Sequence, residues 1–146
     1  MEIEQRVGEA FREISIRATR PREAIARQLT ELGEKGESFS ADDFLRRLRR
    51  AAPGIGRATV YRSIEKLVAL RLLDRIDFED GTHVYRLCGS AGHHHHLACT
   101  ACHRVVDLDV CLDKGQIEAI GRREHFRIEN HAITLFGRCR ECAKAH

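Results

Sequence analysis

Two cysteine pairs constrain this sequence more than any other feature. They are Cys99-x-x-Cys102 and Cys139-x-x-Cys142, and 36 residues separate them. Two short loops that each carry two thiolates form a closed tetrahedral zinc site, with no position open for a substrate. A redox dithiol is the alternative for either pair alone, but two pairs at matched spacing favour structural zinc. We therefore predict that Zn²⁺ joins the two ends of the intervening segment.

That segment has the pattern of a small α/β domain. Strand-like stretches cover Val105–Val110 and Phe126–Phe136, and a helical stretch from Leu112 to Glu124 lies between them. The zinc would hold the first and last parts of this domain together.

Charge and metal ligands are divided between the two halves of the chain. All six cysteines and all nine histidines lie from His83 onward. Residues 44–75 carry nine Lys and Arg against two Asp and Glu, a net charge of +7, although the whole chain has only +3. We predict a DNA-binding domain over residues 1–88, a hinge at the small residues 89–92, and a metal-binding domain over residues 93–146.

The first half has the pattern of helices followed by a hairpin. Helices are predicted over residues 3–14, from Pro21 to a stop at Gly33, from Ser40 to before Pro53, and over about 57–71. Ser40 and Asp43 approximate a capping box. Two β-rich runs, 73–78 and 83–87, flank an Asp-Gly turn. This order predicts a winged helix-turn-helix, and with the second domain an α+β fold.

The fourth helix has the two faces that a recognition helix needs. At 100° per residue, one apolar arc contains Val60, Ile64, Leu67 and Val68, and the opposite arc contains Ala58, Arg62, Glu65 and Lys66. In a major groove, Arg62 would reach guanine, Tyr61 a thymine methyl or a phosphate, and Arg57 and Thr59 the DNA backbone. A solvated charged face is the alternative, but the +7 segment and the hairpin favour DNA binding.

Four consecutive histidines, His93 to His96, precede the first cysteine pair. In an extended strand His94 and His96 share one face, and His93 and His95 share the other. One tetrapeptide can therefore supply two metal sites. An expression tag is the alternative explanation for four histidines, but tags are usually terminal and longer than this run.

These features together resemble the ferric/zinc uptake regulator family, bacterial metal-sensing repressors with a winged-helix domain and a dimerisation domain. The motifs are Arg17-Ala-Thr-Arg-Pro-Arg22, Phe39-Ser-Ala-Asp-Asp-Phe44, Ala58-Thr-Val-Tyr-Arg62, His93-His-His-His-Leu-Ala-Cys-Thr-Ala-Cys102 and Asn130-His-Ala-Ile-Thr-Leu-Phe-Gly-Arg-Cys139. The resemblance covers nearly the whole chain. It implies that the four paired cysteines hold structural zinc, that Tyr61 and Arg62 read DNA, and that Arg17 reaches a minor groove.

The resemblance also implies a regulatory site, formed by Asp74, Cys88, His94 and His96 as in zinc-sensing members. Iron-sensing members carry a histidine where this chain has Ser38 and a carboxylate near Cys88. One thiolate, two imidazoles and one carboxylate suit tetrahedral Zn²⁺ better than six-coordinate Fe²⁺ or Mn²⁺. Without the resemblance, Cys88 would be interpreted as a small buried residue and Asp74 as a surface acid.

A metal held by these four residues would cross the hinge and fix the angle between the domains. In a symmetric dimer that angle sets the spacing of the two recognition helices, so zinc would favour binding to a palindromic operator and repression.

A third site of the family would use His93, His95 and His131 with a glutamate. This chain has Lys114 at the glutamate position, and an ammonium group cannot ligate zinc. Two alternatives follow: the carboxylate of Asp113 or Glu118 substitutes after a small shift, or the site is weak or empty. The remaining residues considered are Asp107, an alternative regulatory ligand, and Cys111, which is expected to be a core thiol.

Several classes of protein do not fit the sequence. The 146 residues contain no apolar run of membrane-spanning length, no secretory signal and neither H-E-x-x-H nor the deaminase signature, which argues against a zinc hydrolase or deaminase. A thiol oxidoreductase remains an alternative. We expect a cytoplasmic, non-enzymatic regulator that binds double-stranded DNA as a homodimer, without membrane or small-molecule substrate. Sensing of Fe(II), Mn(II) or peroxide is the alternative within the family.

Overall fold

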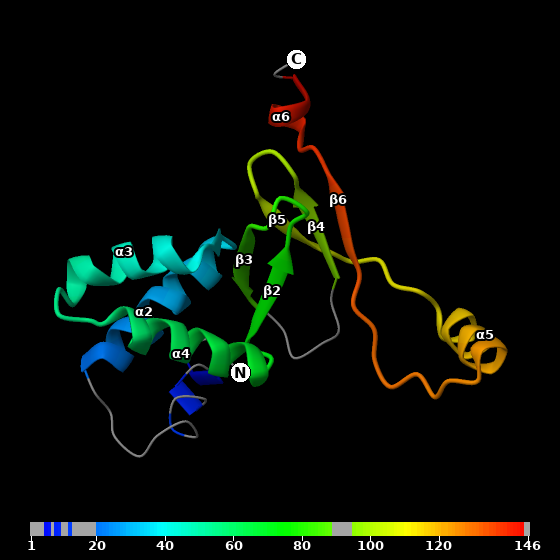
Figure 1. Cartoon of the computed structure of the whole chain (residues 1–146), viewed down its shortest axis with the longest axis horizontal. Helices are drawn as coiled ribbons and strands as arrows, with labels where there is room; N and C mark the ends of the chain where they lie inside the picture. Colours follow the sequence, from blue (N-terminus) through cyan, green and yellow to red (C-terminus); the bar gives the residue numbers. More distant parts are fainter. Residues whose placement is uncertain (1–4, 7, 10–11, 13–19, 89–94, 145–146) are drawn as a thin grey trace. The chain divides into compact units, whose positions relative to one another are not determined.

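The computed structural model describes residues 5–6, 8–9, 12, 20–88 and 95–144 (Figure 1). The chain divides into two compact units, residues 1–91 and 92–146. The apolar positions of the helix predicted over residues 3–14 lie outside the described residues, as do Arg17, His93, His94 and the predicted hinge.

Three helices of the first unit pack through apolar faces. They are α2 (Arg20–Lys35), α3 (Ala41–Ala51) and α4 (Arg57–Ala69). Ile25, Leu29 and Leu32 recur on one face of α2 and are all buried. The predicted stop at Gly33 is wrong, because α2 continues to Lys35 and the left-handed residue that follows it is Gly36, with φ +64°.

The start of α3 is the one that the sequence predicts. The Ser40 side chain accepts a hydrogen bond of 3.1 Å from the backbone amide of Asp43, which satisfies one of the free donors of the first turn. Phe44 and Leu48 of this helix then pack into the core of the unit. The cap therefore sets where the apolar face begins.

A three-stranded antiparallel sheet completes the first unit. Its order is β1 (Ser38–Phe39), β3 (His83–Leu87), β2 (Leu73–Asp77). Gly81, with φ +86°, forms the turn of the β2–β3 hairpin, as the Asp-Gly pair predicts. Strand β1 was not predicted, because a two-residue strand is too short to produce an alternating pattern. With its helices and hairpin, the unit is a winged helix.

The second unit is built on a mixed sheet. β4 (His95–Cys99) lies in the middle, antiparallel to β5 (Val105–Leu108) and parallel to β6 (Thr134–Gly137). Two helices accompany it, α5 (Lys114–Glu124) and α6 (Arg140–Lys144). The strand predicted from Phe126 is wrong in its start, because residues 125–133 have no regular structure and β6 begins at Thr134.

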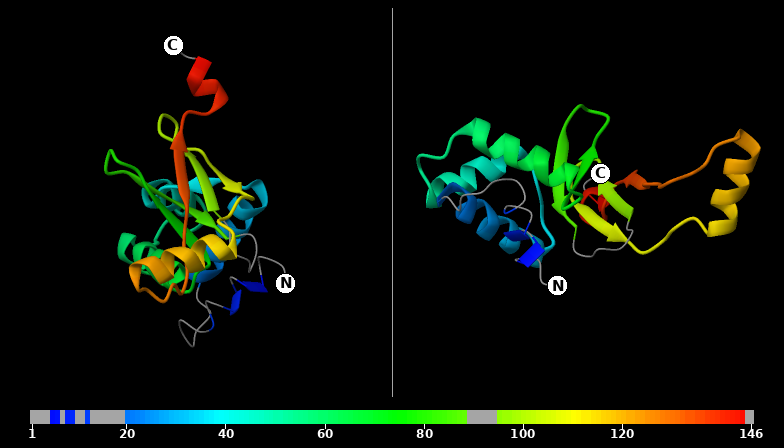
Figure 2. Two further views of the ribbon diagram at one scale, coloured as in Figure 1. Left: turned by 90° about the vertical axis from the view of Figure 1, so that its right-hand side faces the viewer. Right: turned by 90° about the horizontal axis from the view of Figure 1, so that it is seen from below.

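Helix α5 contributes little to the core of its own unit. Figure 2 shows it at the end of two long connections that leave and rejoin the sheet. Gly121 is its only buried residue. No helix among the described residues is long and apolar enough to span a membrane.

Candidate metal centres and nucleic-acid interface

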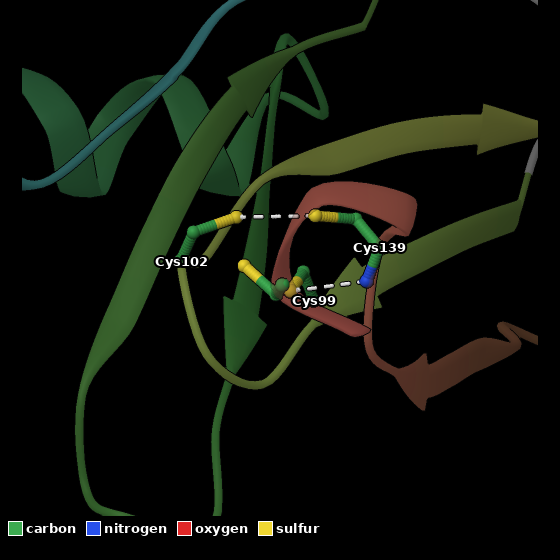
Figure 3. A group of neighbouring side chains, drawn as sticks. Cys99, Cys102 and Cys139 are labelled. Atoms are coloured by element: carbon green, nitrogen blue, oxygen red, sulfur yellow. Dashed lines mark hydrogen bonds between the residues drawn. The ribbon is translucent and has the colours of Figure 1, made fainter. Parts of the chain in front are cut away.

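The two cysteine pairs meet at one end of the second sheet. Cys99 ends β4, and its parallel neighbour in β6 is Gly137, so the loops that follow both strands start side by side. The sulfurs of Cys99, Cys102, Cys139 and Cys142 all lie within 4.8 Å of one another. Figure 3 shows the side chains of three of them pointing into a common space. The parallel pairing of β4 and β6 therefore assembles the cluster that the spacing predicts.

The dimensions of the cluster fit a tetrahedral cation. The sulfurs of Cys102 and Cys139 are 3.8 Å apart, and a tetrahedral zinc with bonds of about 2.3 Å separates its sulfurs by about 3.8 Å. None of the described cysteines, these four included, forms a disulfide. Four soft donors at these distances match the ligand set of structural zinc.

Hydrogen bonding shifts the pKa values of Cys99 and Cys142 in opposite directions. The backbone amide of Cys139 donates to Cys99 Sγ at 3.3 Å and lowers the pKa of this thiol to about 6. Hydrogen bonding with Cys139 raises the pKa of the Cys142 thiol to about 12. The sulfurs cannot all ionise at neutral pH unless a cation compensates their charge, so this cluster is suited to a metal.

The residues of the expected regulatory site are described in part. Asp74 lies half-buried in β2 and Cys88 is buried directly after β3, both within the winged helix. His96 lies in β4 of the second unit, and His94 lies outside the described residues. The structure thus describes three of the four residues, each within its own unit.

His96 has an acidic neighbour within the second unit. Asp107 is its cross-strand partner in β5, and Asp107 Oδ1 lies 3.4 Å from His96 Nδ1. The His96 side chain is buried and that of Asp107 is half-exposed. The residue that the sequence analysis named as an alternative ligand is therefore beside one of the expected ligands.

A second group of metal-ligating side chains joins His95 and His131 to Cys111. Their ligand atoms lie within 4.8 Å of one another. Cys111 Sγ is 3.0 Å from His131 Nε2, and the rings of His95 and His131 are 5.0 Å apart. The interpretation of Cys111 as a core thiol is wrong, because its side chain is exposed. The family resemblance placed His95 and His131 in one site, together with His93, which lies outside the described residues. The sequence did not indicate Cys111 as their neighbour.

The carboxylates that were considered as substitutes have other partners. Asp113 caps α5, where its side chain accepts a 2.9 Å bond from the Gln116 amide. Glu118 lies 3.8 Å from Lys114 Nζ and 3.9 Å from an Arg122 nitrogen. Neither belongs to the His95 group within the described residues.

Helix α4 has the two faces that its sequence predicts. Val60, Ile64 and Leu67 are buried, and the opposite arc with Arg62 is exposed. The Arg62 side chain donates to the carbonyl of Ala58 one turn earlier. The exposed face of α4 is therefore available to a ligand, with its basic group near the start of the helix.

Two of the predicted DNA contacts are joined by a residue that sequence reasoning missed. Asp42 in α3 accepts hydrogen bonds of 2.9 Å from both the Arg57 guanidinium and the Tyr61 hydroxyl. The Tyr61 hydroxyl, and after it Arg57, lowers the pKa of the Asp42 carboxyl, and the same bond raises the pKa of Tyr61. Arg57 also lies over the Tyr61 ring. Thr59, the remaining predicted contact in α4, is half-buried.

The sequence and the fold of this chain are both similar to those of known proteins. The family model described as "Ferric uptake regulator family" matches residues 13–136. The ferric uptake regulation protein of Bacillus subtilis (strain 168) is 37% identical over 139 residues, covering 94% of this chain and 92% of that protein. Among solved structures, the ferric uptake regulator of Vibrio cholerae is 27% identical, with a TM-score of 0.67 and coverage of 92% and 98%. A zinc uptake regulator in complex with zinc and DNA shares the fold, with a TM-score of 0.66, 20% identity and coverage of 99% and 97%.

Proposed function

The chain belongs to the ferric uptake regulator family of metal-dependent transcriptional repressors, and we propose that the metal it senses is zinc. It is a transcription regulator and not an enzyme. Its four-cysteine cluster is the structural metal site typical of the family, and we propose that it holds Zn²⁺. As for other regulators that act on DNA, we propose a cytoplasmic location.

The observation that carries the zinc proposal is the thiol of Cys88. This side chain is 4% exposed and directly follows the last strand of the wing, close in sequence to the segment between the units. With Asp74, His94 and His96 it would give one sulfur, one oxygen and two nitrogen donors, a set that Zn²⁺ accepts in tetrahedral geometry. Ser38, which lies across β3 from Asp74, offers only a weakly ligating hydroxyl.

In this proposal zinc acts by joining the two units. Asp74 and Cys88 belong to the winged helix, and His94 and His96 to the β4 region. A cation bound by all four would select one angle between the units. The free energy by which the cation favours that angle would equal the gain in the free energy of DNA binding. Asp107, beside His96, would orient that imidazole or replace a ligand.

The surface of the second unit supports a homodimer. Its exposed large apolar side chains are Leu97, Val110, Leu112, Ile120, Phe126, Ile128, Leu135 and Phe136. Outside this unit the described residues expose only one such side chain, Leu70. A second copy of the chain would cover this surface and place two α4 helices against the halves of a palindromic operator. We propose that the operator controls genes for metal uptake.

Each α4 helix would enter a major groove through its exposed face. Arg62 would pair with guanine, Tyr61 would contact a thymine methyl or a phosphate, and Arg57 and Thr59 would contact the backbone. Arg17, outside the described residues, would reach the adjacent minor groove.

A DNA-binding titration tests the proposed signal. With the four-cysteine site loaded, we expect Zn²⁺ at buffered concentrations to raise operator affinity in fluorescence anisotropy, and Cys88→Ser to require more zinc for the same effect. The His125→Asn variant is the control, since it removes an exposed side chain that belongs to none of the proposed metal sites. If zinc leaves operator affinity unchanged, the proposal is wrong.

Iron is the second candidate signal, because the Bacillus subtilis relative is named a ferric uptake regulation protein. The same titration with Fe²⁺ and Mn²⁺ under anaerobic conditions separates the two. A larger gain in affinity with Fe²⁺ than with Zn²⁺, retained in Cys88→Ser, would assign the regulatory site to iron.

A further inference from the structure

The group of His95, Cys111 and His131 lies where three segments of the second unit converge. His95 is the first residue of β4, Cys111 lies in the connection from β5 to α5, and His131 lies in the connection from α5 to β6. The three ligand atoms are within 4.8 Å of one another. The fold therefore brings a thiol and two imidazoles together at the base of α5.

The closest contact in this group is between a soft donor and a ring nitrogen. Cys111 Sγ is 3.0 Å from His131 Nε2, a distance that corresponds to a shared proton in the absence of a metal. A metal that replaces this proton would bind both atoms at once, since metal binding to a thiol and an imidazole releases protons. Cys111 is exposed, His131 is half-buried and His95 is 1% exposed, so the group is open to solvent on one side.

His95 is held in one orientation by the backbone. The amide of Ile133 donates to His95 Nδ1 at 3.0 Å, so the neutral ring carries its proton on Nε2. For Nε2 to bind a metal, the ring proton must move to Nδ1, and the hydrogen bond from Ile133 is given up. Cys111 and His131 are therefore the ligands that bind first, and His95 completes the set from the buried side.

We propose that Cys111, His131 and His95 form a zinc site in which the Cys111 thiolate serves where the family resemblance led us to expect a carboxylate. Lys114 stands at that expected position, and its side chain is 91% exposed. One thiolate and two imidazoles favour Zn²⁺ over harder cations such as Mn²⁺. Water would fill the fourth position. The bound cation would tie both connections of α5 to β4.

Zinc protection of Cys111 from alkylation tests the site directly. The full-length protein, with its four-cysteine site loaded, is treated with iodoacetamide before and after addition of Zn²⁺, and the modified cysteines are identified by peptide mass spectrometry. We expect zinc to slow modification of Cys111 at least about tenfold, because the thiolate is the nucleophile in alkylation and a zinc-bound thiolate is not free to react. Equal rates with and without zinc would overturn the proposal.

Matched variants separate this site from the regulatory one. His131→Asn removes a ligand and should abolish the protection. His125→Asn replaces an exposed histidine outside the group and should retain the zinc protection of Cys111. Asparagine is chosen because it tolerates the left-handed backbone at this position, where φ is 58°. Cys88→Ser removes a proposed regulatory ligand and should also retain the protection of Cys111. The test of this site is therefore independent of the test of zinc sensing.

Zinc stoichiometry provides a second measurement. After dialysis against a weak chelator, Cys111→Ser should hold one zinc fewer per chain than the unmodified sequence, with the same far-ultraviolet circular dichroism. An unchanged zinc content would contradict the proposal.

Discussion

At the scale of single residues, Asp42 links two helices of the winged helix through side chains that are predicted to contact DNA. Its carboxylate holds Arg57 and Tyr61 in place, and as a negative charge it also repels phosphates. We expect Asp42→Asn to raise affinity for unrelated DNA about twofold and to lower discrimination in favour of the operator about tenfold. Competition anisotropy with operator and unrelated duplexes measures both.

Asp43 offers a control one residue away. Its carboxylate is paired with Arg46 at 2.9 Å, so Asp43→Asn removes the same charge without touching Arg57 or Tyr61. We expect the same rise for unrelated DNA and unchanged discrimination. Equal discrimination in both variants would show that Asp42 acts through charge alone.

At the scale of elements, the end of α5 depends on a glycine that packs against the chain after the helix. Phe126 donates from its amide to the Gly121 carbonyl at 2.8 Å, and a Cβ on Gly121 would lie 2.7 Å from the Phe126 carbonyl oxygen. Although alanine is the better helix former, we expect Gly121→Ala to lower the free energy of unfolding by about 1–3 kcal/mol. Denaturant unfolding of the zinc-loaded protein measures the change.

Gly137→Ala is the control for this prediction, since a Cβ there has no atom within 4 Å. Its stability should stay close to that of the unmodified chain. A Gly121→Ala protein more stable than the original would mean that helix propensity outweighs the contact with Phe126.

Element boundaries were predictable where a local signal was unique. Ser40 stands three residues before Asp43, which approximates the spacing of a capping box, and the structure confirms Ser40 as the N-cap. Gly33 and Gly36 are both glycines near the end of α2, and only the folded chain shows that Gly36 takes the left-handed conformation. The strand-like stretch from Phe126 likewise extended β6 too far back, because residues 126–133 pair with no strand in the part of the chain that the structure describes.

At the scale of the whole molecule, the two units differ in what holds them together. Ile25, Phe44 and Leu67 belong to a large apolar core within the winged helix. Among residues 95–144, by contrast, the buried apolar side chains are Ala98, Cys99 and Val105. Small domains with so little core need a metal or a partner chain to be stable.

Removal of the structural metal should therefore affect the units differently. With a strong chelator under reducing conditions, we expect residues 95–144 to lose protection from hydrogen exchange and the dimer to dissociate, while α2, α3 and α4 keep their protection. Hydrogen exchange by mass spectrometry and sedimentation velocity measure the two effects. Simultaneous loss of protection in both units would show that the winged helix depends on the metal.

The sequence alone determined the features that depend on neighbours along the chain. The spacing of each cysteine pair, the apolar arc of α4 and the Asp-Gly turn are local, and each predicted its part of the fold because side-chain period and turn geometry are set within a few residues. Tertiary structure decided which distant segments meet. It placed Asp42 beside Arg57 and Tyr61, and Cys111 beside His131, because these contacts follow from helix packing and from the return of the chain after α5, which no local pattern encodes.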